Sequence, residues 1–112
     1  MAVSSLQLVD NISVINDFSY SQAVNMNGAN AIQVTLVVTA DGGTTVSLVP
    51  QGSNDLSNWT NITVGGAWAG LGAGAKFPAA ATGIAYQYVR ISFKTAAAGP
   101  LVCSAYLCTS FL

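Results

Sequence analysis

Short runs of alternating apolar and polar residues are the main structural signal in this chain. The clearest run is AIQVTLVVTA at residues 31–40, where every second side chain is a large aliphatic one. Successive side chains of a strand point to opposite faces, so this run predicts a strand with one buried face. Residues 44–53 and 84–95 alternate in the same way. In the latter run, one face carries Tyr86, Tyr88, Arg90, Ser92 and Lys94.

Weaker alternation extends this pattern over most of the chain. Residues 4–10 fit either an N-terminal strand or an arm, within residues 1–10, that lies on a neighbouring chain. Both faces of the run at 101–112 are largely apolar, which is typical of a central strand or of an interface. The remaining weaker strands are predicted at 12–20 and 59–64.

Turn residues separate the runs. Asn27-Gly28 is a strong turn signal. Asp41-Gly42-Gly43 stands directly between two alternating runs and predicts that residues 31–40 and 44–53 form a hairpin. Helix signals are nearly absent. About seven strands at intervals of roughly ten residues therefore predict a single all-β domain over residues 1–112, an antiparallel β-sandwich of the jelly-roll type.

Residues 65–83 interrupt the strands with a stretch rich in Gly and Ala that also contains Trp68. Such a composition cannot build a core of its own, yet it carries too little charge for an ordinary solvated linker. We therefore expect a long excursion that packs closely against another surface, either in the same chain or in a neighbouring subunit.

Charge is unusually scarce. Charged residues make up 6% of the chain and hydrophobic residues 52%, with a formal net charge of −1. Only three residues are positive, which argues against binding of DNA or RNA. No apolar run is long enough for a membrane-spanning helix. A surface with so few charges is typical of subunit interfaces, so we expect a homo-oligomer.

Catalytic chemistry has few candidate residues. The chain has no His and no Glu, and its acidic residues are four Asp. The residues that would partner a general acid or base, a Ser–His–Asp triad or an activated Cys are missing, so we expect no enzyme, no cofactor and no metal. The weaker alternative is a calcium site built from side chains and carbonyls of GSNDLSN, residues 52–58, where a single carboxylate makes a poor set of ligands. If 101–112 is a strand, Cys103 and Cys108 point to opposite faces, too far apart for a disulfide.

The segment QGSNDLSNWTNI, residues 51–62, is the most distinctive motif. Its Asp, Asn and Ser side chains are typical of a turn in which they bond nearby backbone amides. We expect Trp59 to hold the next strand in the sandwich. The turn residues are Gly52, Asn54, Asp55 and Asn58.

Aromatic residues near polar ones give the chain its candidate binding surface. They suit either subunit contacts or sugar stacking, so a carbohydrate- or surface-binding module, with a glycan as partner, is the alternative to assembly. The candidate interface or surface-binding residues are Trp59, Trp68, Tyr86, Tyr88, Arg90 and Tyr106.

The pattern VSLVPQGSNDLSNWTNI, followed downstream by YQYVRISF, resembles small β-sandwich structural proteins of tailed phages and prophages. The resemblance covers roughly residues 44–95, and a similar turn and strand occur in the longer discoidin-type modules. The phage resemblance implies a self-assembling virion component, a capsid decoration protein or a part of the tail or neck. It implies other virion structural proteins as partners, and a place in the virion after assembly in the host cytoplasm.

Overall fold

A computed structural model describes residues 3–64, 68–97 and 100–111, and the regular secondary structure in these ranges consists of β-strands. The longer strands are β1 (Val3–Val14), β4 (Ala31–Ala40), β5 (Val46–Ser53), β8 (Tyr88–Thr95) and β9 (Leu101–Ser110). The shorter ones are β2 (Ser19–Tyr20), β3 (Val24–Asn25), β6 (Thr60–Asn61) and β7 (Gly74–Lys76).

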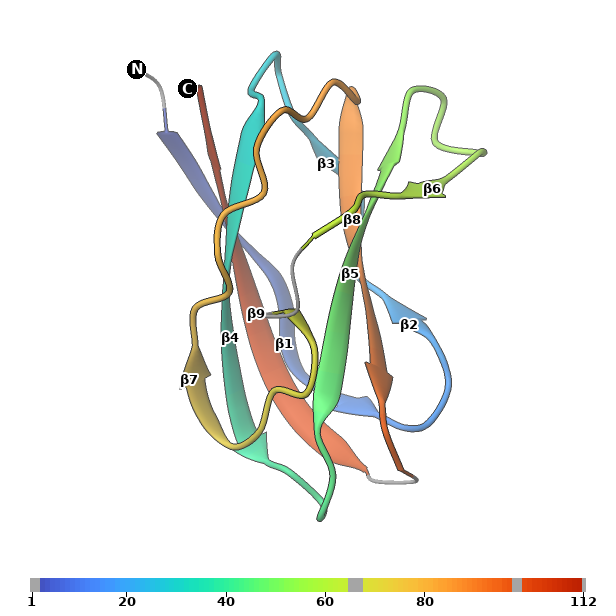
Figure 1. The fold of residues 1–112 in the computed structure, drawn as a ribbon, viewed down its shortest axis with the longest axis vertical. Coiled ribbons are helices and arrows are strands. Elements are labelled where there is room, and N and C mark those ends of the chain that lie inside the picture. The colour runs from blue at the N-terminus through green and yellow to red at the C-terminus, as the bar shows by residue number, and fades with distance from the viewer. Residues whose placement is uncertain (1–2, 65–67, 98–99, 112) are drawn as a thin grey trace.

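The strands form two antiparallel sheets that pack face to face (Figure 1). Sheet A has the order β1-β9-β4-β7, and sheet B has the order β2-β8-β5-β6, with β3 also paired to β8. The predicted all-β, two-sheet architecture is therefore confirmed. Of the two alternatives for the run at 101–112, the structure shows the central strand, because β9 (Leu101–Ser110) lies between β1 and β4.

The core lies between the two sheets and consists of the side chains that the alternation places on one face. In β4 and β8 the predicted faces are the observed ones, and Val34, Leu36 and Ile91 are fully buried. On the described residues, no buried side-chain nitrogen or oxygen lacks a hydrogen-bond partner. The other fully buried large side chains include Val14, Met26, Ile32, Val46, Leu48, Val89, Phe93, Leu101 and Leu107.

The predicted hairpin of residues 31–40 and 44–53 is wrong. Asp41-Gly42-Gly43 does form a turn, closed by a hydrogen bond from the Thr44 amide to the Asp41 carbonyl, and both glycines have positive φ. However, β4 pairs with β9 and β7 in sheet A, whereas β5 pairs with β8 and β6 in sheet B. The turn therefore crosses from one sheet to the other. A hairpin turn and a turn between sheets both need residues that tolerate positive φ, so the sequence of the turn does not distinguish them.

The single strand predicted at residues 12–20 is also wrong. β1 ends at Val14, and the chain bends before β2 begins at Ser19. Residues 21–23 then separate β2 from β3, although both strands pair with β8. The Ser21 hydroxyl accepts a hydrogen bond from the Ile91 amide, 2.9 Å away, and so replaces a backbone partner at this break.

Three other predicted boundaries differ. Residues 4–10, expected as a strand or an arm, belong to β1 and pair with β9 of the same chain. The strand predicted at 59–64 is reduced to β6. β8 begins at Tyr88 rather than at residue 84, because the preceding backbone bonds to loops: the Ile84 amide donates to Asn30 and the Gln87 carbonyl accepts from Met26.

The excursion predicted at residues 65–83 packs against its own sandwich. From Trp68 onward it runs along both sheets: Leu71 exchanges two backbone hydrogen bonds with Val46 of β5, and Ala81 exchanges two with Ile32 of β4. Between them, β7 pairs with β4. Residues 65–67 lie outside the described part of the chain. The described excursion thus closes the side of the sandwich opposite β1 and β2 (Figure 1).

Candidate functional site

The 51–62 motif forms the β5–β6 hairpin, and its turn is organised around one carboxylate. Gln51 and Gly52 pair with Asn61 and Thr60. Within the turn, Asp55 Oδ1 accepts hydrogen bonds from the amides of Ser57 and Asn58 at 2.9 and 2.8 Å, and from the Ser53 hydroxyl at 3.0 Å. Its Oδ2 accepts from Asn58 Nδ2 at 2.7 Å. The predicted turn chemistry is therefore present.

These hydrogen bonds favour the ionised form of Asp55. The Asn58 amide has the largest effect, followed by the Asn58 side chain, the Ser57 amide and the Ser53 hydroxyl, and together they hold the pKa of Asp55 well below its ordinary value. At neutral pH the turn therefore presents a fixed negative charge whose remaining lone pairs only accept hydrogen bonds.

Leu56 stands at the tip of this turn and was not singled out by its sequence. Its φ is +65°, which is uncommon for a residue with a side chain, and it is 49% exposed. Its amide donates to the Ser53 hydroxyl at 3.0 Å, so the surrounding hydrogen bonds hold this conformation. The corner thus exposes an apolar side chain from a backbone position that hydrogen bonds hold.

Arg90, on the outer face of β8, lies between two aromatic rings. Its Cζ is 4.1 Å from the centroid of the Tyr20 ring and 4.3 Å from that of Trp59. Arg90 Nε donates to Gln51 Oε1 at 2.8 Å, and Gln51 Nε2 donates to Asn61 at 2.9 Å. Each cation–π contact contributes about 0.5–2 kcal/mol. Arg90 therefore ties β2, β5 and β6 to β8 across one face.

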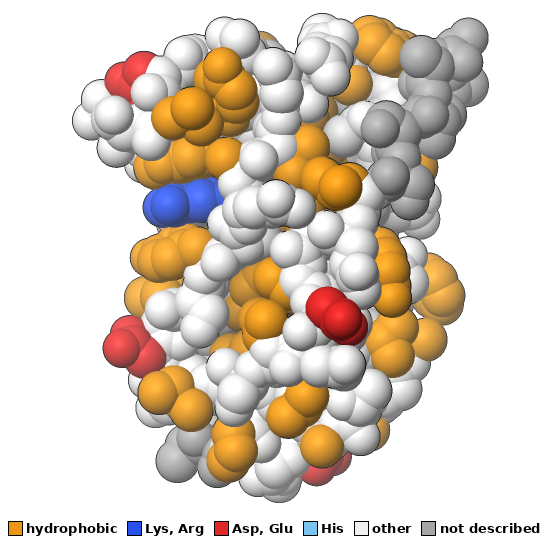
Figure 2. Space-filling view, turned by 180° about the vertical axis from the view of Figure 1, so that it is seen from behind, with side chains coloured by type: hydrophobic (Ala, Val, Ile, Leu, Met, Phe, Trp, Pro, Cys, Tyr) orange, Lys and Arg blue, Asp and Glu red, His pale blue; other side chains and the backbone are white. Residues whose placement is uncertain are grey.

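The stack continues along the same face. Phe18 and Tyr20 are stacked with ring centroids 6.3 Å apart, and Lys94 Nζ lies 4.9 Å from the Phe18 centroid. Figure 2 shows, on the left, basic side-chain atoms with hydrophobic side chains above and below them. The structure thus joins two predicted residues, Trp59 and Arg90, to Phe18, Tyr20 and Gln51, which sequence reasoning missed.

Trp59 and Tyr86 line a shallow depression at the β5–β6 corner, with a volume of about 310 Å³. Tyr86 packs directly on Gly52, where a Cβ atom would overlap its ring. All four predicted turn residues take part in this site. The full lining is Gly52, Ser53, Asn54, Asp55, Asn58, Trp59, Thr60 and Tyr86.

A second depression of about 280 Å³ adjoins the first, since Asn54 and Tyr86 line both. Its other lining residues include Ala85 and Gln87. The Gln87 amide donates to Asn54 Oδ1 at 2.9 Å, so the loop before β8 holds the Asn54 side chain in place. The predicted candidate Tyr88 begins β8 beside this site, and its hydroxyl accepts a hydrogen bond from Gln87 Nε2.

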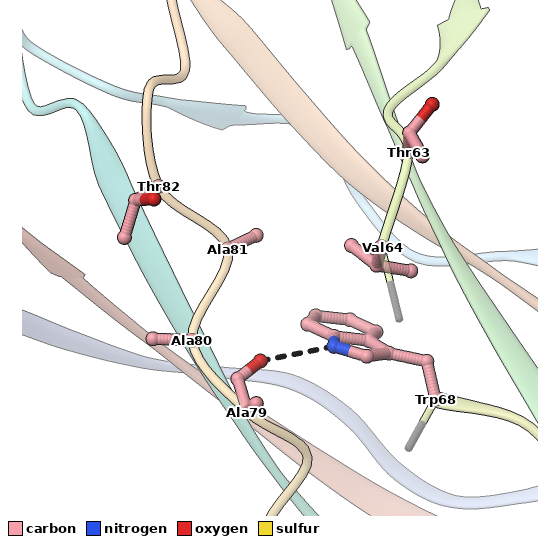
Figure 3. Close-up of a pocket in the computed structure, with 7 residues that line it drawn as sticks. All are labelled: Thr63, Val64, Trp68, Ala79, Ala80, Ala81 and Thr82. Carbon is pink, nitrogen blue, oxygen red and sulfur yellow. Dashed lines mark hydrogen bonds between the residues drawn. The ribbon is translucent and has the colours of Figure 1, made fainter. Parts of the chain in front are cut away.

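Trp68 is not on the surface. It is 2% exposed and belongs to the core, and its Nε1 donates to the Ala79 carbonyl at 2.9 Å. Figure 3 shows the indole between Val64 and the segment that contains Ala79 and Ala81. Of the two tryptophans, Trp68 therefore fastens the fold and Trp59 is available at the surface, where it is half-buried against Arg90.

The remaining candidates lie on β9. Tyr106 is exposed on the outer face of sheet A, and its hydroxyl accepts a hydrogen bond from Gln7 Nε2. Cys103 and Cys108 are free thiols on opposite faces of β9, as the strand prediction required. Burial raises the pKa of the Cys103 thiol to about 11, so this group is an inert part of the core.

In the described ranges, no helix has the length and apolarity to cross a membrane. Within the same ranges, His, Cys, Asp and Glu side chains nowhere gather in threes around a shared metal position. The chain matches no protein-family model, and comparison with curated proteins finds no significant relative, so the resemblance to phage structural proteins depends on residues 44–95 alone.

Proposed function

We propose that this protein is a structural component that works by self-assembly, as a virion-type protein that decorates a capsid or forms part of a tail or neck. The observation that carries the proposal is the number of large hydrophobic side chains on a surface with few charges. On the described residues the exposed ones are Leu6, Ile15, Phe18, Tyr20, Leu56, Phe77, Tyr106 and Phe111. With charged residues at 6% of the chain, such a surface suits burial between copies.

The exposed apolar residues at the bend from β1 to β2 are the best candidates for the contact between copies. Ile15, Phe18 and Tyr20 are 52%, 54% and 48% exposed, and all three lie at or beside the bend from β1 to β2. β1 and β2 end the strand orders of their sheets, whereas the opposite side of the sandwich is closed by the excursion. We call the bend and its three apolar residues the β1–β2 edge. Burying it would stabilise a dimer by about 25 cal/mol per Å² of apolar area.

The pairing of strands supports a jelly-roll fold, an architecture common in capsid proteins and lectins. The first strand pairs with the last, and β2 and β3 both pair with the next-to-last strand, β8. Further inward, β4 pairs with β7 and β5 with β6. A jelly roll is this nested arrangement of a long hairpin wrapped into two sheets. We propose it here with β2 and β3 as one interrupted strand.

The decisive experiment is the mass of the purified chain in solution at micromolar concentration, measured by light scattering and sedimentation. We expect an oligomer. The double variant Ile15→Asn/Phe18→Asn should weaken self-association about tenfold or more, because it removes two apolar contacts. Phe77→Asn is the matched control, since Phe77 is exposed beyond β7 at the closed side.

A wild-type monomer at these concentrations would contradict the proposed function. An oligomer that the double variant does not affect would contradict only the placement of the contact at the β1–β2 edge. Circular dichroism and thermal unfolding of each variant separate loss of assembly from loss of folding.

A further inference from the structure

The corner formed by the β5–β6 turn combines features that assembly does not use. It has two aromatic side chains, Trp59 and Tyr86, beside the fixed polar groups of Asn54 and Asp55, all around one depression. Its volume of about 310 Å³ is at the lower end of the range for small-molecule sites, about 300–1,000 Å³. The 54–58 turn is at the upper right of Figure 1, and in the reversed view of Figure 2 an acidic side chain at the upper left lies near hydrophobic ones.

The polar groups of two residues that line the depression, Asn54 and Asp55, offer one donor and one acceptor. Asn54 Oδ1 already accepts from the Gln87 amide, so its Nδ2 is left as a donor with no hydrogen-bond partner among the described residues. Within the described part of the chain, Asp55 Oδ2 accepts a single hydrogen bond, from Asn58 Nδ2, and so has room for a second one. A hydroxyl group both donates and accepts, so two neighbouring hydroxyls of one molecule can satisfy both groups.

The aromatic groups are held in place before anything binds. Arg90 covers Trp59 at 4.3 Å and is itself held by Tyr20 and Gln51. Tyr86 is pressed against Gly52, where only a residue without a Cβ atom leaves room for the ring. A rigid aromatic surface offers contact area at low entropic cost, and its face suits the C–H groups of a sugar ring.

The charge and polarity of the depression argue against three classes of ligand: anions, purely apolar molecules and divalent cations. Among the described residues that line the depression, Asp55 is the one with a charged side chain, and its carboxylate repels anions. A purely apolar molecule would leave Asn54 Nδ2 and Asp55 Oδ2 without partners, which is costly. A divalent cation would find a single carboxylate whose Oδ1 already accepts three hydrogen bonds.

We propose that the β5–β6 corner is a binding site for neutral saccharides, with a sugar ring against Trp59 or Tyr86 and two adjacent hydroxyls on Asn54 and Asp55. The adjoining depression shares Asn54 and Tyr86 with the first and provides room for a second sugar unit. Disaccharides and longer glycans therefore bind more tightly than monosaccharides. The site lies on β5, β6 and the loop before β8, and its lining residues are not part of the β1–β2 edge, although Tyr20 of that edge contacts Arg90, which covers Trp59.

The test uses the full chain on an array of neutral, sialylated and sulfated oligosaccharides, followed by titration with the neutral disaccharides that bind. We expect neutral glycans to bind with little dependence on salt. The Trp59→Ala variant should bind a disaccharide about tenfold or more weakly than the wild type does. Phe77→Ala, an exposed aromatic residue outside both depressions, should bind as the wild type does.

Two further measurements keep the test valid if Trp59→Ala folds poorly. Acrylamide quenching of wild-type tryptophan fluorescence should decrease when a bound disaccharide covers Trp59, because Trp68 is buried and contributes little quenching. Trp59→Phe keeps an aromatic face and should still bind on the array, but the protection from quenching should disappear. An absence of neutral glycan binding by the wild type would overturn the proposal. Binding restricted to acidic glycans, weakened by salt and lost in Arg90→Met, would also overturn it.

Discussion

The two tryptophans of this protein occur in opposite sequence surroundings and have opposite positions. Trp59 follows a polar turn motif that looks like a structural corner, yet it lies half-buried on the outer face of sheet B against Arg90. Trp68 belongs to a Gly- and Ala-rich stretch that looks like a surface excursion, yet it is in the core. Polar neighbours therefore indicate where the chain turns but not which way the aromatic side chain points.

The largest expected effect is on stability, and it tests directly whether the two tryptophans have different roles. Trp68→Ala should lower the free energy of unfolding by about 3–5 kcal/mol, since it empties a core position and leaves the Ala79 carbonyl without its donor. Trp59→Ala should cost only about 1–2 kcal/mol, mostly from its contact with Arg90. Urea unfolding of both variants measures the difference. Equal losses would mean that the two tryptophans are equivalent anchors.

Gly52 tests how tightly the corner is packed. Gly52→Ala should destabilise the protein by about 1–3 kcal/mol, because the new methyl group overlaps the Tyr86 ring. In a Tyr86→Ala background the same substitution should cost almost nothing, as a double-mutant cycle would show. An undiminished cost in that background would mean that the strain comes from elsewhere.

Arg90 tests whether the outer face of sheet B is held by its cation. Arg90→Met keeps an apolar stem but loses two cation–π contacts and the hydrogen bond to Gln51, so we expect a loss of about 1–2 kcal/mol in thermal or urea unfolding. Arg90→Lys keeps the charge without the planar group and should recover part of this loss. Equal stability of the Met variant and the wild type would contradict a fastening role.

The smallest effect is the pH dependence of the turn. The pKa of Asp55 is lowered in the folded state, so its contribution to stability is present above the ordinary Asp pKa and is lost as the pH falls below about 4. Asp55→Asn should therefore make the melting temperature less dependent on pH in this acidic range. Asp17→Asn is the control, because the described residues give the Asp17 carboxylate a single hydrogen bond, from the Phe18 amide. Identical acid profiles for wild type and Asp55→Asn would contradict this role of the carboxylate.

Local patterns in the sequence predicted the faces of the strands well. The faces of β4 and β8 were predictable because a period of two is enforced wherever one side of a sheet is buried. The turn at Asp55 was predictable because short polar side chains next to the backbone act within a few residues. These features depend only on neighbours along the chain.

Features that depend on distant residues were not predictable in this way. The Asp41-Gly42-Gly43 turn would look the same in a hairpin as in the observed crossing between sheets, because the choice depends on β9 and β8 taking the neighbouring positions. Likewise, nothing near Tyr20 indicates that Arg90 will lie on its ring. The break in pairing after β2 was not predictable either, because it depends on the Ser21 hydroxyl, which accepts a hydrogen bond from the distant Ile91 amide in place of a backbone carbonyl.

The pairing of β1 with β9 has a consequence for how the chain reaches its folded state. Val3 lies opposite Ser110, and the described ends of the chain lie side by side in Figure 1. In sheet A, β9 pairs with both β1 and β4. The two earlier strands therefore cannot form these pairings until β9, near the other end of the described chain, has joined the sheet. Folding through such distant pairings is slow, on the order of milliseconds to seconds, and leaves apolar strand edges exposed meanwhile. A chain with so few charges to keep it in solution is therefore most vulnerable to aggregation before its last strand is inserted.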